Sequence, residues 1–161
     1  MCSSMADGVN GLLPHLHARD VTLLFVSRAP LEKLHAYRRR MGWGMPWASS
    51  ANSDFNFDLG VSYNDAQVRS VLGDGEPPPI LRQMAESTGT DVAGYVSEGP
   101  AFSAFALADG AVYHTYFTQA RGLEFLLGYY PILDRTPRGR HEDDVSEHWI
   151  RRHDEYGEAA G

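Results

Sequence analysis

The sequence is poor in cysteine, in long apolar runs and in positive charge, and each shortage excludes a class of protein. Cys2 is the only cysteine in 161 residues, which excludes an internal disulfide and a zinc site built from cysteines. No apolar stretch approaches the ~18 residues that a membrane-spanning helix needs. The net charge of −7 argues against a nucleic-acid partner, because phosphates require a basic face. Nothing in the sequence indicates a cofactor.

The composition and the start of the chain predict a protein of the reducing cytoplasm. Met1 to Gly11 lacks the basic region and the apolar run of a secretory signal. A content of 43% hydrophobic and 22% charged residues is typical of a globular protein. The length predicts one domain over residues 1–161, with a polar C-terminal tail over residues 136–161. The basic run Arg38–Arg40 is expected on a solvated helix face.

The clearest segments indicate an α/β protein. We expect a short helix over residues 3–13, a strand buried on both faces over residues 20–27, and a helix from Pro30 to Gly42. Asp109-Gly110 lies between two alternating runs, 102–107 and 112–117, which predicts a β-hairpin with a tight turn. A last helix is expected from about Ala120, closed or kinked at Pro131.

The middle of the chain, residues 43–100, gives weaker signals. Residues 46–49 suit a short strand, and residues 54–58 alternate polar and apolar side chains with the period of a strand. Glycine and proline predict a loop over residues 73–79, and one or two helical turns are expected over residues 80–86.

Cys2 is the first candidate for chemistry because it stands where the first predicted helix opens. Unpaired backbone N–H groups and the positive end of the helix dipole favour a thiolate at such a position. The alternative is a terminal residue without a catalytic role. Complete intramolecular exchange needs a second thiol, which this chain does not offer.

Several other side chains have both a structural and a functional interpretation. His114 on the hairpin is either a hydrogen-bonded structural residue or a catalyst, and alternation places it on one face with Val112 and Tyr116. Arg121 near a helix start is expected to pair with a carboxylate, for which Asp134 is one candidate. Trp43 and Trp47, like Phe55 and Phe57, are expected to cover the core, with a substrate-facing role as the alternative.

Two histidine groups have metal binding as a minor alternative. His15 and His17 flank Leu16 and precede Asp20, but no third histidine is anchored nearby. The tail gathers a larger set, which is more typical of a solvated charged segment: His141, Glu142, Asp143, Asp144, His148, His153 and Asp154. We therefore assign no metal ligand from the sequence.

The order of the predicted elements resembles a thioredoxin fold without its first strand. The amino-acid sequence is more specific than the order of elements, and a second resemblance, over nearly the whole chain, is carried by these segments: Cys2-Ser3 with Ala6-Asp7, 16–20, 26–32, 39–43, 53–58, 114–116 with 120–122, Asp134 with Thr136-Pro137, and 152–154. Together they resemble the bacterial thioredoxin-like family of unknown function named predicted dithiol-disulfide oxidoreductases, domain-of-unknown-function family 899.

The resemblance implies a thiol-disulfide oxidoreductase in which Cys2 is one of two active cysteines. It implies that Pro100 faces the thiols, with the cis peptide bond that thioredoxins have before this proline. The alternative is an ordinary strand-flanking proline with a trans peptide bond. It also implies an upstream strand and a cysteine three positions before Cys2. We expect that strand to be missing, with apolar edges that favour homo-oligomers or a protein thiol or disulfide partner. The alternative function is a non-catalytic thioredoxin-like binding or accessory module.

Overall fold

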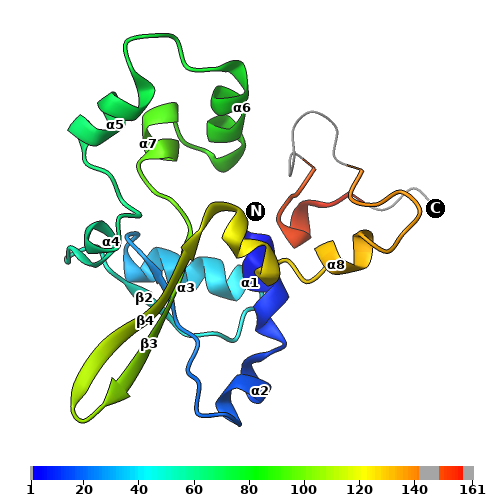
Figure 1. The fold of residues 1–161 in the computed structure, drawn as a ribbon. Helices are drawn as coiled ribbons and strands as arrows, with labels where there is room; N and C mark the ends of the chain where they lie inside the picture. The colour runs from blue at the N-terminus through cyan, green and yellow to red at the C-terminus, as the bar shows by residue number, and fades with distance from the viewer. Residues whose placement is uncertain (1, 142–148, 158–161) are drawn as a thin grey trace. The chain divides into compact units, whose positions relative to one another are not determined.

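The computed structural model describes residues 2–141 and 149–157, and contacts divide the chain into two compact units. Unit 1 comprises residues 1–52 and 121–161, and unit 2 comprises residues 53–120. Figure 1 colours the chain from blue at the N-terminus to red at the C-terminus, so that the segments of each unit can be traced. The mixture of helices with small sheets confirms the α/β class. A single domain over residues 1–161 stays a prediction.

Unit 1 is built around a short parallel pair of strands and the helices beside it. Strand β1 (Phe25–Ser27) pairs with β2 (Trp47–Ser49) in parallel, and α3 (Leu31–Arg40) makes the crossover between them. The remaining elements are α1 (Cys2–Asn10), α2 (Leu13–His17), the 3₁₀ helix η1 (Ala120–Leu126), whose first residue belongs to unit 2, α8 (Tyr130–Leu133) and the 3₁₀ turn η2 (His153–Glu155).

The core of unit 1 brings the first helix against the crossover. Ala6 and Val9 of α1 are buried against Met41, Trp43 and Met45, which follow α3. Partly buried side chains complete this cluster: Leu13, Leu23, Phe25, Tyr37, Trp47 and Leu126. Burial of one face of α1 against this cluster holds the helix that begins at Cys2, because a short helix depends on such packing more than on propensity.

Three expectations for unit 1 need correction. The strand expected over residues 20–27 is limited to Phe25–Ser27 and is half-buried, while Val21 and Leu24 are 47% and 49% exposed. A strand is buried on both faces only when other elements cover both faces of its sheet. Among the described residues, β1 pairs with β2 alone, in a sheet of two strands. The helix expected over residues 3–13 ends at Asn10, and Pro14 lies in the first turn of a second helix, α2, where its missing N–H leaves no hydrogen bond unmade.

The last predicted helix is also divided. The chain forms the 3₁₀ helix η1 and then the short α8, with Pro131 in the first turn of α8, where proline is tolerated. The apolar spacing predicts one face with Leu123, Leu126, Leu127 and Tyr130. Leu123, Leu127 and Tyr130 are buried, and Leu126 is partly buried.

Unit 2 contains a group of helices and a long hairpin. The helices are α4 (Phe55–Asp58), α5 (Asp65–Leu72), α6 (Pro79–Thr88) and α7 (Val92–Val96). The alternating stretch 54–58 therefore folds as a helical turn, with the N–H of Asp58 bonded to the carbonyl of Asp54 at 2.8 Å. The hairpin consists of β3 (Ala101–Ala108) and β4 (Ala111–Gln119), which confirms the prediction.

The hairpin turn and a bulge fix which side chains share a face. Asp109 and Gly110 both have positive φ, 51° and 76°, the geometry that an Asp-Gly turn supplies. A register shift between Ala104 and Phe105 opposes Phe105 to His114 and Ala104 to Tyr116. The simple alternation that grouped His114 with Tyr116 is therefore wrong, because a bulge reverses the facing of the residues beyond it.

Within the described residues the strands form two separate two-stranded sheets, β1–β2 and β3–β4. No described helix is long and apolar enough to cross a membrane. The finer thioredoxin-like assignment stays a prediction at this point.

Candidate functional site

Cys2 is the first residue of α1, and its side chain is exposed as a free thiol. The nine-residue helix directs the unpaired N–H groups of its first turn toward this end. The opposite side of the helix is anchored by buried Ser4, Met5, Ala6 and Val9. The thiol is therefore accessible from solvent on a helix that is itself fixed to the core.

The two serines that follow Cys2 are each bonded to a tyrosine hydroxyl from a distant part of unit 1. The Ser3 hydroxyl oxygen lies 2.6 Å from the Tyr37 hydroxyl oxygen. The Tyr129 hydroxyl donates to the Ser4 hydroxyl oxygen at 3.0 Å. Tyr37 belongs to α3, and Tyr129 directly precedes α8. These two bonds tie the first turn of α1 to two other elements, so the turn that carries Cys2 is fixed on two sides.

Tyr37 has a second polar partner in Arg152. The Nε–H of Arg152 donates to the Tyr37 hydroxyl oxygen at 3.1 Å. A guanidinium has no acceptor, so the tyrosine oxygen accepts from Arg152, while either hydroxyl can be the donor in the bond between Ser3 and Tyr37. The Tyr37 ring packs edge-on against Trp43 at 5.3 Å between centroids, which holds the hydroxyl in place.

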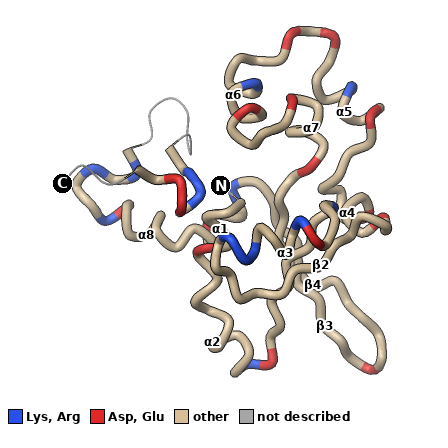
Figure 2. The backbone as a smooth tube through the Cα atoms, turned by 180° about the vertical axis from the view of Figure 1, so that it is seen from behind, with Lys and Arg blue, Asp and Glu red and all other residues tan. Residues whose placement is uncertain are grey.

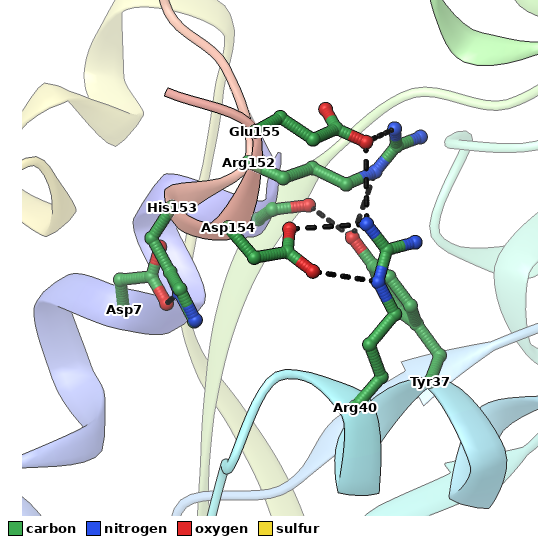
Figure 3. A network of polar contacts seen from close by, with 8 residues as sticks. Asp7, Tyr37, Arg40, Arg152, His153, Asp154 and Glu155 are labelled. Carbon is green, nitrogen blue, oxygen red and sulfur yellow. Dashed lines mark hydrogen bonds and ion pairs between the residues drawn. The ribbon is translucent and has the colours of Figure 1, made fainter. Parts of the chain in front are cut away.

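Arg152 belongs to a segment that we call the C-terminal strap, residues 151–156. The strap is closed on itself because the Arg151 N–H donates to the Tyr156 hydroxyl at 3.0 Å. It is bound to α3 through Arg40, whose guanidinium donates to both carboxylate oxygens of Asp154 at 2.7 and 3.0 Å. Figure 3 shows this network, with Arg40 and Tyr37 on one side and Asp7 on the other.

Charge within the strap is balanced locally. Glu155 accepts from Arg152 at 2.6 Å and from Arg40 at 3.3 Å. The hydrogen bond from Arg40 holds the pKa of Asp154 below its ordinary value, and the bond from Arg152 does the same to the pKa of Glu155. The same bonds raise the pKa of both arginines, so the network is fully ionised near neutral pH.

A further contact binds the strap directly to α1. His153 Nδ1 lies 2.7 Å from Asp7 Oδ1. The same carboxylate oxygen accepts the indole N–H of Trp43 at 2.7 Å. Asp7 therefore links the strap, the first helix and the aromatic core.

The two tryptophans predicted as substrate residues lie together in unit 1. Their ring centroids are 5.8 Å apart. Trp43 is only 6% exposed and belongs to the core, while Trp47 is half-buried and donates its indole N–H to the Ser27 hydroxyl at 3.0 Å. The expectation that they cover the core is confirmed, and contact with a substrate stays a prediction.

The other predicted site residues are Arg121, which belongs to unit 1, and Pro100 and His114, which belong to unit 2. Arg121 is exposed and pairs with Glu124 at 2.6 Å, whereas Asp134, its expected partner, binds Arg140 at 2.7 Å. Pro100 and His114 belong to unit 2, with exposed side chains and a trans peptide bond before Pro100. The facing of Pro100 and Cys2 stays a prediction.

His114 has neighbours that account for its position in the hairpin. Its Nε2 lies 3.2 Å from the Ser103 hydroxyl oxygen. Its ring stacks on Phe105 at 4.7 Å and meets Phe117 edge-on at 6.1 Å, as the bulged register requires. These contacts agree with the structural interpretation of His114.

Metal binding gains no support from the described part of the chain. Residues 2–141 and 149–157 contain no group of three histidine, cysteine or acidic side chains that could hold an ion. His15 and His17 are exposed on α2. Most of the acidic and histidine-rich set in the tail, residues 142–148, lies outside the described residues.

The sequence reasoning missed Tyr37, Tyr129 and Arg152 as parts of the site. Tyr37 lies 34 positions from Ser3, Tyr129 lies 125 positions from Ser4, and Arg152 lies 115 positions from Tyr37. No local spacing in the sequence reveals such contacts. The available signals were the pair of serines after Cys2 and the segment Arg152-His153-Asp154, which carried part of the family resemblance.

The sequence model described as "Bacterial protein of unknown function (DUF899)" matches residues 1–156. That stretch includes both Cys2 and the whole C-terminal strap. Neither a curated protein nor a solved structure matches the chain.

Proposed function

The chain belongs to the bacterial family of unknown function DUF899, and from this premise we propose that it is a thioredoxin-like protein that performs thiol–disulfide exchange through Cys2. The observation that carries the proposal is an exposed thiol on the first residue of a helix whose first turn is fixed by two tyrosine hydroxyls. Exposure gives access to a partner disulfide, and the fixed helix end favours the thiolate.

The proposed step is a simple exchange. The Cys2 thiolate attacks one sulfur of a partner disulfide, a new sulfur–sulfur bond forms, and the partner's other sulfur leaves as a thiolate. The product is a mixed disulfide between Cys2 and the partner. Because Cys2 is the one cysteine in this chain, a second exchange releases it: a thiolate from another molecule attacks the partner's sulfur in the mixed disulfide, and Cys2 leaves as a thiolate.

The experiment compares the folded chain with the same chain unfolded in urea. Both react with glutathione disulfide at several pH values, and intact mass follows the mixed disulfide. The folded chain is expected to form the mixed disulfide faster than the unfolded chain, because the first turn of a helix favours the thiolate that attacks. Cys2→Ser must abolish the product. Equal rates at every pH would reject the proposal.

A second candidate function, a non-catalytic binding module that pairs with a second copy of itself, rests on the hairpin of unit 2. Its strands expose large apolar side chains: Phe105 47%, Leu107 75%, Val112 69%, Tyr113 53% and Tyr116 52%. Figure 2 shows no charge along β3 and β4 apart from the turn, so no like charges oppose an edge-to-edge contact between two copies.

Sedimentation separates the two candidates. The binding module is favoured if wild type self-associates, Val112→Lys does not, and Cys2 reacts with glutathione disulfide no faster in the folded than in the unfolded chain. A monomer with a reactive Cys2 would favour exchange.

A further inference from the structure

We propose that the open edge of β1 is a dimer interface, at which the β1 strands of two copies of the chain pair in antiparallel fashion about Leu24. The basis of the inference is a strand edge that has no pairing strand and no charge, in a sequence that is complementary to itself when two copies run in opposite directions. The inference does not depend on thiol–disulfide exchange. It concerns a surface of unit 1, whereas the exposed hairpin belongs to unit 2.

The ladder between β1 and β2 shows which main-chain groups of β1 remain for a further strand. The N–H of Phe25 donates to the carbonyl of Pro46, and the N–H of Ser50 donates to the carbonyl of Ser27, both at 3.0 Å. Because successive residues of a strand direct their main-chain groups to opposite edges, the N–H and C=O of Val26 face away from β2. Within the described residues β1 pairs with β2 alone, so no strand binds this edge.

A sheet of this size favours the addition of strands. The β1–β2 pair has three residues in each strand, and two-stranded sheets are marginally stable on their own. Natural proteins commonly protect open edges with charged residues, proline or a bulge. Residues 21–27, Val-Thr-Leu-Leu-Phe-Val-Ser, contain no charged residue and no proline, and Val21 and Leu24 are exposed. The run therefore offers open main-chain groups and apolar surface without a device against pairing.

Two copies of this run match in an antiparallel register centred on Leu24. In that register Leu24 of one copy faces Leu24 of the other, and Thr22 faces Val26. These positions alternate with those that bond to β2, so the main-chain groups at the open edges of both copies meet each other. Leu23 and Phe25 lie on the other face and keep their packing against the core of unit 1. The product is a continuous sheet of four strands.

The charges at the two ends of the run favour this direction of pairing. Asp20 is exposed and Arg28 is half-buried, and each lies four residues from Leu24. Antiparallel pairing about Leu24 places Asp20 of each copy opposite Arg28 of the other, so the two-fold symmetry gives two pairs of opposite charge. Parallel pairing in register would place like charges opposite one another, which is destabilising. The partner that this edge fits is therefore a second copy of the chain.

Cysteine cross-linking in the Cys2→Ser background of the full-length chain tests the register. Leu24→Cys places the two new thiols directly opposite, with Cα atoms about 5.5 Å apart, which is within the range of a disulfide. Mild oxidation is expected to give a covalent dimer. Thr22→Cys is the matched control, because Thr22 is also exposed but its two copies lie about 14 Å apart in this register. No covalent dimer with Leu24→Cys, or an equal yield with Thr22→Cys, would overturn the register.

Sedimentation at several protein concentrations tests the interface itself. Wild type is expected to form a dimer. Leu24→Lys, which places two ammonium groups opposite each other at the symmetry axis, is expected to be a monomer with an unchanged circular dichroism spectrum. Val112→Lys, on the hairpin of unit 2, is expected to remain a dimer. A monomeric wild type, or a dimer that is lost in Val112→Lys and kept in Leu24→Lys, would overturn the inference.

Asp20→Asn measures the contribution of the charges. Asparagine tolerates the positive φ of 57° at this position, so the variant removes the charge and keeps the backbone. The dissociation constant of the dimer is expected to rise two- to thirtyfold, roughly the effect of two exposed ion pairs, and to depend less on salt than in wild type. An unchanged dissociation constant contradicts the pairing of Asp20 with Arg28. A monomer whose Cys2 reacts faster folded than unfolded would reject the dimer and leave the exchange proposal standing, so the two failures are distinguishable.

Discussion

Gly8 allows α1 to pass close to the backbone of unit 1, and replacing it with alanine is expected to destabilise the protein. A β carbon at Gly8 would overlap the carbonyl oxygen of Leu126, which is backbone and cannot rotate away. Overpacking costs about 1–3 kcal/mol, and a rigid backbone partner places this substitution near the upper end. Alanine regains about 1 kcal/mol of helix propensity. The net loss is therefore about 2 kcal/mol.

Thermal unfolding followed by circular dichroism measures this loss. For a chain of this size, about 2 kcal/mol corresponds to a Tm lower by roughly 4–8 °C. Gly11→Ala is the matched control, because a β carbon there meets nothing within 4 Å. It is expected to be neutral or to stabilise by up to about 1 kcal/mol. A Gly8→Ala protein as stable as wild type would refute the close approach of α1 to Leu126.

Three further predictions concern other parts of the chain. Leu127→Ala, at a side chain 0% exposed, is expected to cost about 2–5 kcal/mol in urea unfolding, whereas Ile132→Ala at 66% exposure should change stability little. Asn64→Ala removes the side chain that caps α5 and should cost about 1 kcal/mol, seen as faster amide exchange in α5 and largely avoided by Asn64→Asp. Because the hydrogen bond from Arg40 lowers the pKa of Asp154 in the folded state, the Asp154 carboxylate stabilises the fold above its unfolded pKa, and this stabilisation is lost as the pH falls through the folded pKa. Asp154→Asn should therefore make the free energy of unfolding less dependent on pH below about pH 4. An unchanged slope there would contradict the contact between Asp154 and Arg40.

The parts of the fold that the sequence predicted are those with strong local signals. The hairpin follows from alternation on both sides of Asp109-Gly110, and α3 follows from Pro30 and an apolar face that ends near Gly42. The helices α5 and α7 were missed, although Asn64 and Asp91 each cap the helix that follows. The stretch 54–58 was ambiguous because a single helical turn is too short to show its period.

The sequence predicted only the part of the candidate site that has a local signal. The thiol of Cys2 and its place at a helix start followed from sequence alone. The contacts of Tyr37, Tyr129 and Arg152 join positions far apart in the chain, so they depend on tertiary structure. The face of His114 was mispredicted because a bulge shifts the strand register, and a bulge leaves no mark in a pattern of alternating residues.

The most direct test of the account is the reaction of Cys2 with glutathione disulfide, followed by intact mass in the folded chain, in the same chain unfolded in urea and in Cys2→Ser. The account predicts a mixed disulfide that forms faster on the folded chain and does not form in Cys2→Ser. Equal rates in the folded and the unfolded chain would contradict the claim that Cys2 is a working thiol of thiol–disulfide exchange.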